Sequence, residues 1–434
     1  MLVLLLLEME ISRKSKRRAM EDKFFNLPTD VLNCILDHLP VRDAARTSIL
    51  SRKWRYIWAN HPNLVLEPKN MFGDPANISS DDFIRIVDGI LLQHIGPILT
   101  FKVNLLDVDI TQEPYVDRWI LYLSRNGLRK LTLDNFSLDL YDLYPLPSYV
   151  LLCRELTHLH LSNCIFKRPC GTTGSFRSLK NLSLKQVAFS LEVSASIFTA
   201  SKLEYLKLTK CSGIEHLNFD GCVESLLHLV LEMNHEVKLS CFMNCKSIKS
   251  AYLAMEVESF DPNERINLTS LFEHWSQISK LTMDGRHLKF LAAAYVTSAL
   301  PVKVNNLRDL ILFGINFTDL DQISCILCLL HSSPRLNNLA IWVKVSETAD
   351  KNPALQYLQE HICISKHINS LQTLMIKYFE GSRAQMLFVK LILACCPSLE
   401  RISFVDNRVK AWNLSNILKK LLLFPRVSKA QIVF

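Results

Sequence analysis

The residues best suited to chemistry in this sequence are cysteines and histidines, which in combination can bind a metal ion. Cys325 and Cys328 form a CxxC pair, and His331 follows three residues later. Thiolate and imidazole groups are the usual ligands of structural zinc. However, the pair falls in an apolar run over 321–330 that predicts a helix, and this favours packing in the core over metal binding.

Other candidate ligands and catalytic groups do not gather into a site. Cys241 with Cys245, and Cys395 with Cys396, have no second ligand pair nearby in the sequence, so we expect no metal site. The sequence contains no GxxxxGK(S/T), GxGxxG, HExxH or GxSxG motif and no carboxylate pair that stands out as an acid and a base. We therefore expect no catalytic residue and no cofactor, and we predict that the chain is not an enzyme.

Composition and charge exclude further classes of function. The 434 residues include 50 basic and 42 acidic residues, and the net charge of +8 is too mild for a nucleic-acid-binding protein of this length. The 13 cysteines are an odd number without a fixed period, which is typical of reduced thiols in the nucleus and/or cytoplasm. The apolar start at 1–7 is too short to span a membrane. The basic run at 12–18 is either a nuclear import signal or a solvated tail.

A repeated motif of the form apolar-x-x-apolar-x-apolar dominates the chain from residue 98 to residue 404. The last two apolar positions alternate with other residues, as in a short strand with one buried face. One such strand cannot bury its face alone, but stacked copies form a continuous core. The twelve copies begin at Ile98, Leu128, Leu156, Leu179, Leu203, Leu226, Ile248, Ile278, Leu307, Leu336, Leu371 and Leu399.

Helices are expected between some of these strands. Apolar residues recur at helical spacing in 116–123, 266–275, 323–330 and 386–393, and Gly127 ends the first of these helices. Parallel strands joined by helices predict a curved array with the strands on its concave side and the helices on its convex side. The residues that flank the buried pair in each strand then lie on the concave face.

The segment 24–66, ahead of the repeats, is a separate helical unit. Its apolar residues recur at helical spacing in two runs, which Pro40 and Pro62 end. Fewer than about 45 residues rarely sustain a hydrophobic core alone. The segment must therefore bury surface either on the rest of this chain or on a partner protein.

This helical unit resembles an F-box of the plant type, because it carries the ordered pattern LP…D…I…LP…DA…SxLSxxW. The resemblance implies that the unit docks a Skp-like adaptor, which attaches to a cullin scaffold and a ubiquitin-conjugating enzyme. Some of the patterned residues must instead hold the three expected helices together. The predicted adaptor contacts are Leu27, Pro28, Ile35, Leu39, Leu50 and Trp54.

The rest of the chain resembles plant leucine-rich repeats of irregular length, with an FBD domain at its end. Cys164, Cys211 and Asn234 fall eight residues after the first leucine of their repeats, where leucine-rich repeats place asparagine or cysteine. The predicted fold is α/β: a small helical F-box, a curved leucine-rich-repeat solenoid and a C-terminal FBD cap. The predicted domains are a leader and basic tail at 1–23, the F-box at 24–66, a connector at 67–80, the irregular repeats at 81–367 and the FBD domain at 368–434.

Substrate contacts are expected on the concave face. The early strands present polar residues such as Tyr205 and Lys207, whereas later strands present Phe313 and Trp342. Exposed aromatic residues on a concave surface predict a docking patch for a protein substrate, with Tyr205 and Lys207 as polar contacts. In the alternative interpretation, long loops or the FBD segment cover these aromatic residues.

Two hypotheses for the function follow. In the first, the chain is the substrate-recognition subunit of a Skp–cullin–F-box ubiquitin ligase, and its partners are the adaptor, the cullin scaffold and an unidentified protein substrate. In the second, the chain is a scaffold or binding protein whose F-box packs on the repeats and recruits no ligase. Neither hypothesis requires a nucleic acid, a membrane or a cofactor. Copurification with a Skp-like adaptor distinguishes them.

Overall fold

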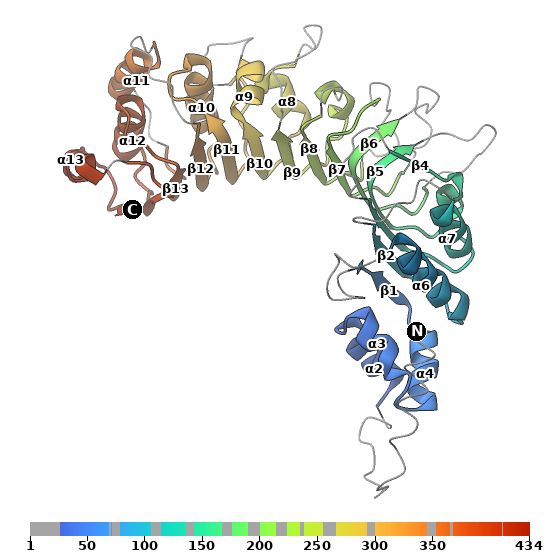
Figure 1. The fold of residues 1–434 in the computed structure, drawn as a ribbon. Coiled ribbons are helices and arrows are strands. Elements are labelled where there is room, and N and C mark those ends of the chain that lie inside the picture. The colour runs from blue at the N-terminus through green and yellow to red at the C-terminus, as the bar shows by residue number, and fades with distance from the viewer. Residues whose placement is uncertain are drawn as a thin grey trace, which may run out of the picture.

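The structure of the chain is a computed structural model (Figure 1). It describes residues 27–68, 71, 79–105, 114–135, 143–166, 176–189, 200–213, 224–234, 238–254, 266–292, 300–344, 353–364, 368–409 and 411–434. The leader and basic run predicted at 1–23, and most of the connector predicted at 67–80, lie outside the described residues.

Three short helices open the described chain. They are α2 (Thr29–Asp37), α3 (Val41–Thr47) and α4 (Arg52–Ala59). Pro28 and Pro40 directly precede α2 and α3, at positions where a helix does not need the N–H that proline lacks. Ser51 caps α4, because its side chain accepts a hydrogen bond from the N–H of Trp54 at 3.2 Å. The sequence therefore marks the start of each helix.

A sheet of parallel strands runs from these helices to the C-terminus. Its strand order follows the chain from β1 to β15, with β4 paired to β5 beside this path. The strands are β1 (Asn63–Leu66), β2 (Thr100–Asn104), β3 (Lys130–Asp134), β4 (Tyr144–Leu146), β5 (His158–Phe166), β6 (Asn181–Phe189), β7 (Tyr205–Thr209), β8 (His228–Glu232), β9 (Ser250–Ala254), β10 (Lys280–Asp284), β11 (Asp309–Ile315), β12 (Asn338–Val343), β13 (Thr373–Lys377), β14 (Arg401–Val405) and β15 (Gln431–Val433). Each of the twelve motif copies forms one strand, and its two alternating apolar residues are buried.

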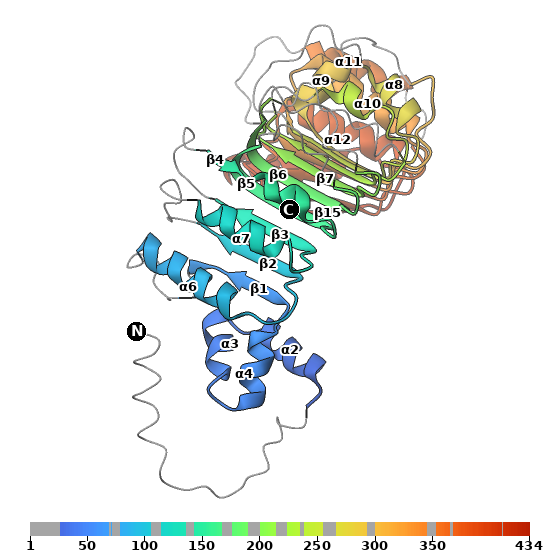
Figure 2. The ribbon, with the colours of Figure 1, turned by 90° about the vertical axis from the view of Figure 1, so that its right-hand side faces the viewer.

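The returning segments cover the outer face of this sheet, and the strands line the inner face of a curved array (Figure 1, Figure 2). The helices and 3₁₀ helices are α6 (Ser80–Gln93), α7 (Tyr115–Leu123), η3 (Ser148–Leu152), η6 (Leu239–Phe242), α8 (Leu268–His274), α9 (Gly285–Ala292), α10 (Leu320–Ser332), α11 (Pro353–Ile364), α12 (Arg383–Cys395) and α13 (Ala411–Leu423). The four helices predicted from spacing correspond to α7, α8, α10 and α12. The predicted α/β class, with concave strands and convex helices, is confirmed.

The chain turns in the same way at the end of many strands. In seven motif copies of the described chain, the residue seven positions after the first apolar residue has a positive φ. These residues are Asn163, Gln186, Lys210, Met233, Gly314, Tyr378 and Asp406. A left-handed residue costs little at glycine and more at other types, so its recurrence shows that the stacking of the repeats imposes this turn.

The residue after this turn can hold neighbouring repeats together. The Asn234 side chain accepts the N–H of Cys211 at 2.8 Å and donates to the carbonyl of Leu208 at 2.8 Å. Cys211 in turn donates its Sγ–H to the carbonyl of Leu184 at 3.5 Å. These contacts connect the ends of β6, β7 and β8. The asparagine and cysteine at this motif position therefore satisfy backbone groups that the turn leaves unpaired.

The cysteines that suggested a metal site lie in the core. Cys325 and Cys328 are buried on α10. Burial raises the pKa of the Cys325 thiol, which disfavours the thiolate form that binds a metal. Within the described ranges, no three histidine, cysteine or acidic side chains gather as metal ligands, and no helix is long and apolar enough to cross a membrane.

We predict that Asn234→Ala lowers the free energy of unfolding by about 1–3 kcal/mol, because the variant leaves two buried backbone groups without a partner. Urea denaturation followed by circular dichroism measures the change. The matched control is Asn305→Ala, which removes an exposed asparagine and should change the free energy by less than about 0.5 kcal/mol. Equal effects of the two substitutions would show that the buried contacts of Asn234 do not stabilise the repeats.

Candidate functional site

The three N-terminal helices share a small hydrophobic core. Its members are Leu32, Leu36, Ala44, Trp54 and Ile57. Trp54, which the sequence suggested as an adaptor contact, is only 6% exposed and therefore holds the helices together instead of facing a partner. Leu27, Ile35 and Leu39 are half-buried at the edge of this core. The carbonyl of Leu27 also accepts a hydrogen bond from Lys53 at 3.1 Å, which fixes the start of the unit.

Several apolar side chains of this helical unit are exposed. Val31 on α2 is 43% exposed, Leu50 before α4 is 60% exposed, and Pro28 is also exposed. A shallow, open hollow on α2 is lined by Asp30, Val31, Cys34, Ile35, His38 and Leu39. Val31 was not among the residues selected from the sequence, although it stands four residues before Ile35 and so shares its helix face. Exposed apolar side chains around a hollow are typical of a surface that a protein partner covers.

Other residues of the unit pack on the first repeat. Val41 of α3 belongs to the core of the repeats, and Trp58 of α4 packs against both cores. The carbonyl of Ala59 accepts the N–H of Ile95 at 2.8 Å, and the carbonyl of Pro62 accepts the N–H of Leu99 at 2.9 Å. The chain then enters β1, which pairs in parallel with β2. The last four residues of the predicted 24–66 segment therefore belong to the sheet.

His61 lies at the centre of this junction. It is 2% exposed, with its Nε2 3.2 Å from an Asp37 oxygen and its Nδ1 3.4 Å from the Asn33 oxygen. Burial lowers the pKa of His61, although the nearby Asp37 carboxylate acts in the opposite direction. Burial also lowers the pKa of His94, and the nearby His61 acts in the same direction. The junction is therefore built around neutral histidines.

Three aromatic side chains gather on the inner face of the sheet. The rings of Tyr252 and Phe313 stack with their centroids 5.6 Å apart, and those of Phe313 and Trp342 are 6.2 Å apart. Phe313 and Trp342 are direct neighbours in the pairing of β11 with β12. Trp342 is 40% exposed, and Met375 on β13 is 41% exposed. The structure thus joins the two predicted aromatic contacts and adds Tyr252, which sequence reasoning had not selected.

The two predicted polar contacts lie elsewhere on the same face. Tyr205 and Lys207 are on β7, four strands from β11, which corresponds to roughly 19 Å at the usual strand spacing. The Tyr205 ring lies 6.4 Å from that of His228, and the Lys207 ammonium is 3.6 Å from a Glu232 oxygen. The four predicted substrate contacts therefore form two separate groups. The sequence already indicated this separation, because three further copies of the motif lie between the strands that carry Lys207 and Phe313.

Comparisons with known proteins agree with this architecture. The F-box domain model matches residues 24–66, and the At1g61320/AtMIF1 leucine-rich-repeat domain model matches residues 90–417, most of the chain. The chain belongs to the plant F-box/FBD/leucine-rich-repeat family. This combination of domains supports a general role as an F-box substrate adaptor, and an F-box implies binding to a Skp-like adaptor.

Relatives from Arabidopsis thaliana are similar over nearly the whole chain. F-box/FBD/LRR-repeat protein At1g13570 is 28% identical to this chain, and the similarity covers 95% of this chain and 98% of that protein. Probable FBD-associated F-box protein At1g32375 is 24% identical over 95% of this chain and 100% of its own length. Among solved structures, the Leptospira interrogans LRR protein LIC12759 matches at 14% identity over 77% of this chain and 95% of its own, but its TM-score of 0.27 supports no conclusion.

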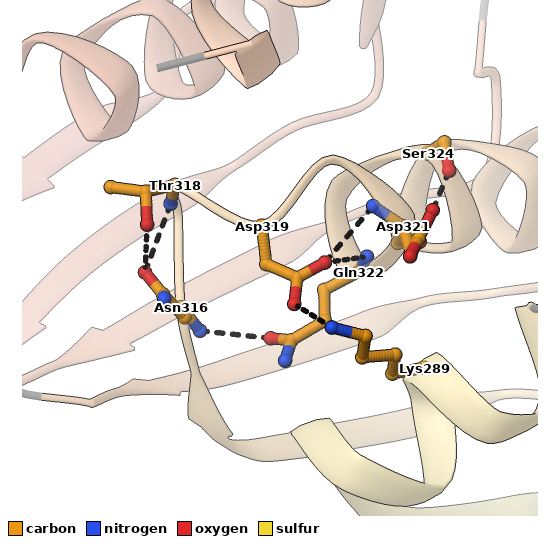
Figure 3. Close-up of polar contacts among 7 residues, drawn as sticks. All are labelled: Lys289, Asn316, Thr318, Asp319, Asp321, Gln322 and Ser324. Atoms are coloured by element: carbon orange, nitrogen blue, oxygen red, sulfur yellow. Dashed lines mark hydrogen bonds and ion pairs between the residues drawn. The ribbon is translucent and has the colours of Figure 1, made fainter. Parts of the chain in front are cut away.

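Polar contacts hold the end of the strand that carries Phe313 in this family member (Figure 3). The buried Gln322 side chain accepts the N–H of Asn316 at 2.9 Å, just after β11. Asp319 caps α10 by accepting the N–H of Gln322 at 3.2 Å, and its other oxygen lies 3.2 Å from the Lys289 ammonium of α9. Two helices thus fix this turn.

The turn after β13 uses the same arrangement. Ser382 caps α12, and three residues later the Gln385 side chain accepts the N–H groups of Glu380 at 2.9 Å and Gly381 at 3.0 Å. Gln385 is 1% exposed. A capping residue followed three positions later by a buried glutamine therefore marks both turns, and this pattern was present in the sequence but not recognised.

A histidine, a carboxylate and a serine also meet on the inner face of the early repeats. His160 Nε2 and Ser162 Oγ bind the same Asp134 oxygen, at 2.7 and 3.3 Å. Burial acts to raise the pKa of Asp134, but these hydrogen bonds outweigh it and hold the pKa below its ordinary value. A nucleophilic serine needs a direct contact with its base. This group instead places the carboxylate between them, which suits a structural role.

We predict that acidification weakens the junction through His61. The folded-state pKa of His61 lies below the ordinary value of 6.5, so the unfolded chain binds a proton first as the pH falls through that value. Stability that is present above pH 6.5 is therefore lost below it. The thermal midpoint of His61→Gln, measured by tryptophan fluorescence, should fall less between about pH 7.5 and 5.5 than that of the wild type.

The matched control for this prediction is His38→Gln, which changes an exposed histidine on α2 and should retain the full acid sensitivity of the wild type. If His61→Gln and His38→Gln were equally acid-sensitive, the buried histidine would not contribute to the pH dependence of the junction.

Proposed function

We propose that the chain is the substrate-recognition subunit of a Skp–cullin–F-box ubiquitin ligase. The packing of the F-box carries this proposal. Val41 and Trp58 pack on the repeats, whereas Val31 and Leu50 remain exposed. A unit that served only to cap the repeats would have no need of an exposed apolar face around a hollow.

The open face has enough apolar surface for specific adaptor binding. Fully burying one large apolar side chain contributes about 1.5–3 kcal/mol, so a few anchors suffice. Val31, Ile35 and Leu50 are the clearest anchors, because they are wholly or partly exposed. Leu39 contributes at the edge of the hollow, and Pro28 lies exposed at the start of α2.

The junction determines how the ligase function would operate. Backbone hydrogen bonds from Ala59 and Pro62 and the pairing of β1 with β2 attach the F-box to the array without a free linker. A substrate on the inner face would then stand at a fixed position relative to the adaptor and cullin, which raises its effective concentration at the conjugating enzyme. The chain itself contributes binding and no bond chemistry. We place this activity in the nucleus and/or cytoplasm.

The alternative function, a scaffold that recruits no ligase, is favoured by the packing of Val41 and Trp58 on the repeats. That packing, however, involves α3 and α4 of the F-box. It leaves the hollow on α2 open. The same molecule can therefore pack its F-box on the repeats and still bind an adaptor, so only a test of adaptor binding distinguishes the ligase from the scaffold.

We predict that the double variant Val31→Asp, Leu50→Asp loses copurification with a Skp-like adaptor. Two carboxylates in an apolar interface remove both anchors and require unpaired charge to be buried, so adaptor affinity should fall by at least about a hundredfold. The control Leu92→Asp introduces the same change at a side chain on α6 that is 82% exposed, and it should bind like the wild type. Absence of adaptor binding by the wild-type chain would contradict the ligase function.

Trp54→Ala tests whether Trp54 stabilises the F-box core, in contrast to the exposed residues that are proposed to bind the adaptor. Truncation of a buried tryptophan creates a cavity and should lower the stability of the F-box by about 3–5 kcal/mol. Hydrogen exchange of the α2 and α4 amides measures this loss, whereas Val31→Asp, Leu50→Asp should leave their protection near that of the wild type. Unchanged protection in Trp54→Ala would show that the indole is not a core residue.

A further inference from the structure

We infer that the inner face at β11 to β14 binds an extended substrate segment that carries an apolar side chain next to carboxylates. This inference rests on the proposed function and names the chemistry of the substrate. It is carried by an exposed aromatic and apolar surface that lies beside three cations, Lys377, Arg408 and Lys344. Of these, only Lys377 forms an ion pair in the described ranges.

The apolar part of this surface is centred on Trp342. In the register of the sheet, Ala340 lies between Ile311 of β11 and Met375 of β13. Because alanine has only a methyl group, it covers little of the neighbouring side chains, and Trp342 and Met375 stay about two-fifths exposed. An apolar side chain placed over Ala340 would contact both of them. Exposed large apolar side chains beside a small residue are a favourable place for an anchor side chain of a partner.

Cations surround this apolar surface at the C-terminal ends of the strands. The Lys377 ammonium lies 5.2 Å from the centre of the Trp342 ring, and the Arg408 guanidinium lies 4.6 Å from that of Tyr378. Lys344 follows β12 directly and is exposed. The carboxylates nearby are Asp406, 3.2 Å from Lys377, the half-buried Glu380, and the buried Asp284, which is the neighbour of Phe313 in the pairing of β10 with β11. In the described ranges, neither Arg408 nor Lys344 forms an ion pair.

Two cations on the early strands contrast with this pattern. Lys102 pairs with Glu67 at 2.7 Å, and Lys207 lies 3.6 Å from Glu232, so carboxylates of neighbouring strands neutralise them. The later strands instead combine exposed apolar area with two cations free of ion pairs in the described chain. Like charge disfavours a basic ligand there, and cations already occupy ring faces of Trp342 and Tyr378. An acidic segment with an apolar anchor complements both features.

The surface is also held in place before any substrate binds. Gln322 fixes the turn after β11, and Gln385 fixes the turn after β13, through hydrogen bonds to backbone N–H groups. Asp406 bonds Lys377 and keeps it over Trp342. Ordering costs on binding are small when the contact residues are already fixed.

Selection of peptides tests the inference without a known substrate. The full chain, bound to its Skp-like adaptor, is immobilised and panned against a displayed library of random peptides about twelve residues long. Enriched sequences should combine a large apolar residue with neighbouring aspartate or glutamate. Binding of enriched peptides, measured by fluorescence anisotropy, should weaken by at least about tenfold in Trp342→Ala and in Arg408→Glu, and should weaken with added salt.

The matched control is Lys130→Glu, which makes the same charge reversal on β3 of the same face, far from this surface, and should leave peptide affinity unchanged. Enrichment of basic peptides, no enrichment at all, or enriched peptides that bind Trp342→Ala and Arg408→Glu like the wild type would each overturn the inference. Copurification of each variant with the adaptor separates the two proposals: retained adaptor binding with failed selection rejects the substrate chemistry alone. Both substitutions lie at exposed positions, and an unchanged thermal midpoint confirms that each variant is folded.

Discussion

Each repeat of this chain contains a strand with two apolar side chains that the repeat cannot cover by itself. Stacking against the next repeat is the way to bury them, and the rest of the structure follows from this constraint. It produces one parallel sheet from β1 to β15, places the helices on the outer face, and leaves the alternate side chains on the inner face. The inner face is available for recognition because the apolar side chains of the same strands are buried on the opposite face of the sheet.

The constraint extends to the F-box, whose own core of five buried side chains is too small to be stable alone. Val41 and Trp58 of the F-box therefore pack in the core of the repeats, and the chain continues directly from the F-box into β1. This attachment leaves Val31 and Leu50 exposed. The packing that stabilises the F-box and the surface that would bind an adaptor thus involve different residues of one small unit.

Much of the fold could be predicted, because burial on one face of a strand leaves a clear alternation in the sequence. All twelve motif copies became strands, and the helices at α7, α8, α10 and α12 lay where their spacing indicated. The site was less predictable, since a pattern shows that Trp54 is apolar but not which neighbour it meets. Tyr252 and Phe313 lie on β9 and β11, which β10 separates, so their contact could be seen only in the packed sheet.

The F-box is fixed to the repeats through α3, α4 and the contacts of His61 with Asn33 and Asp37, whereas the face of α2 around Val31 stays free. Hydrogen exchange of the full chain, with and without a bound Skp-like adaptor, tests this most directly. The account predicts that the adaptor slows exchange in α2 and around Leu50, while the Ile95, Leu99 and Thr100 amides of the junction are protected equally in both states. If the adaptor instead exposed the junction amides, or left α2 unprotected, the F-box would have to leave the repeats before binding and the account would be wrong.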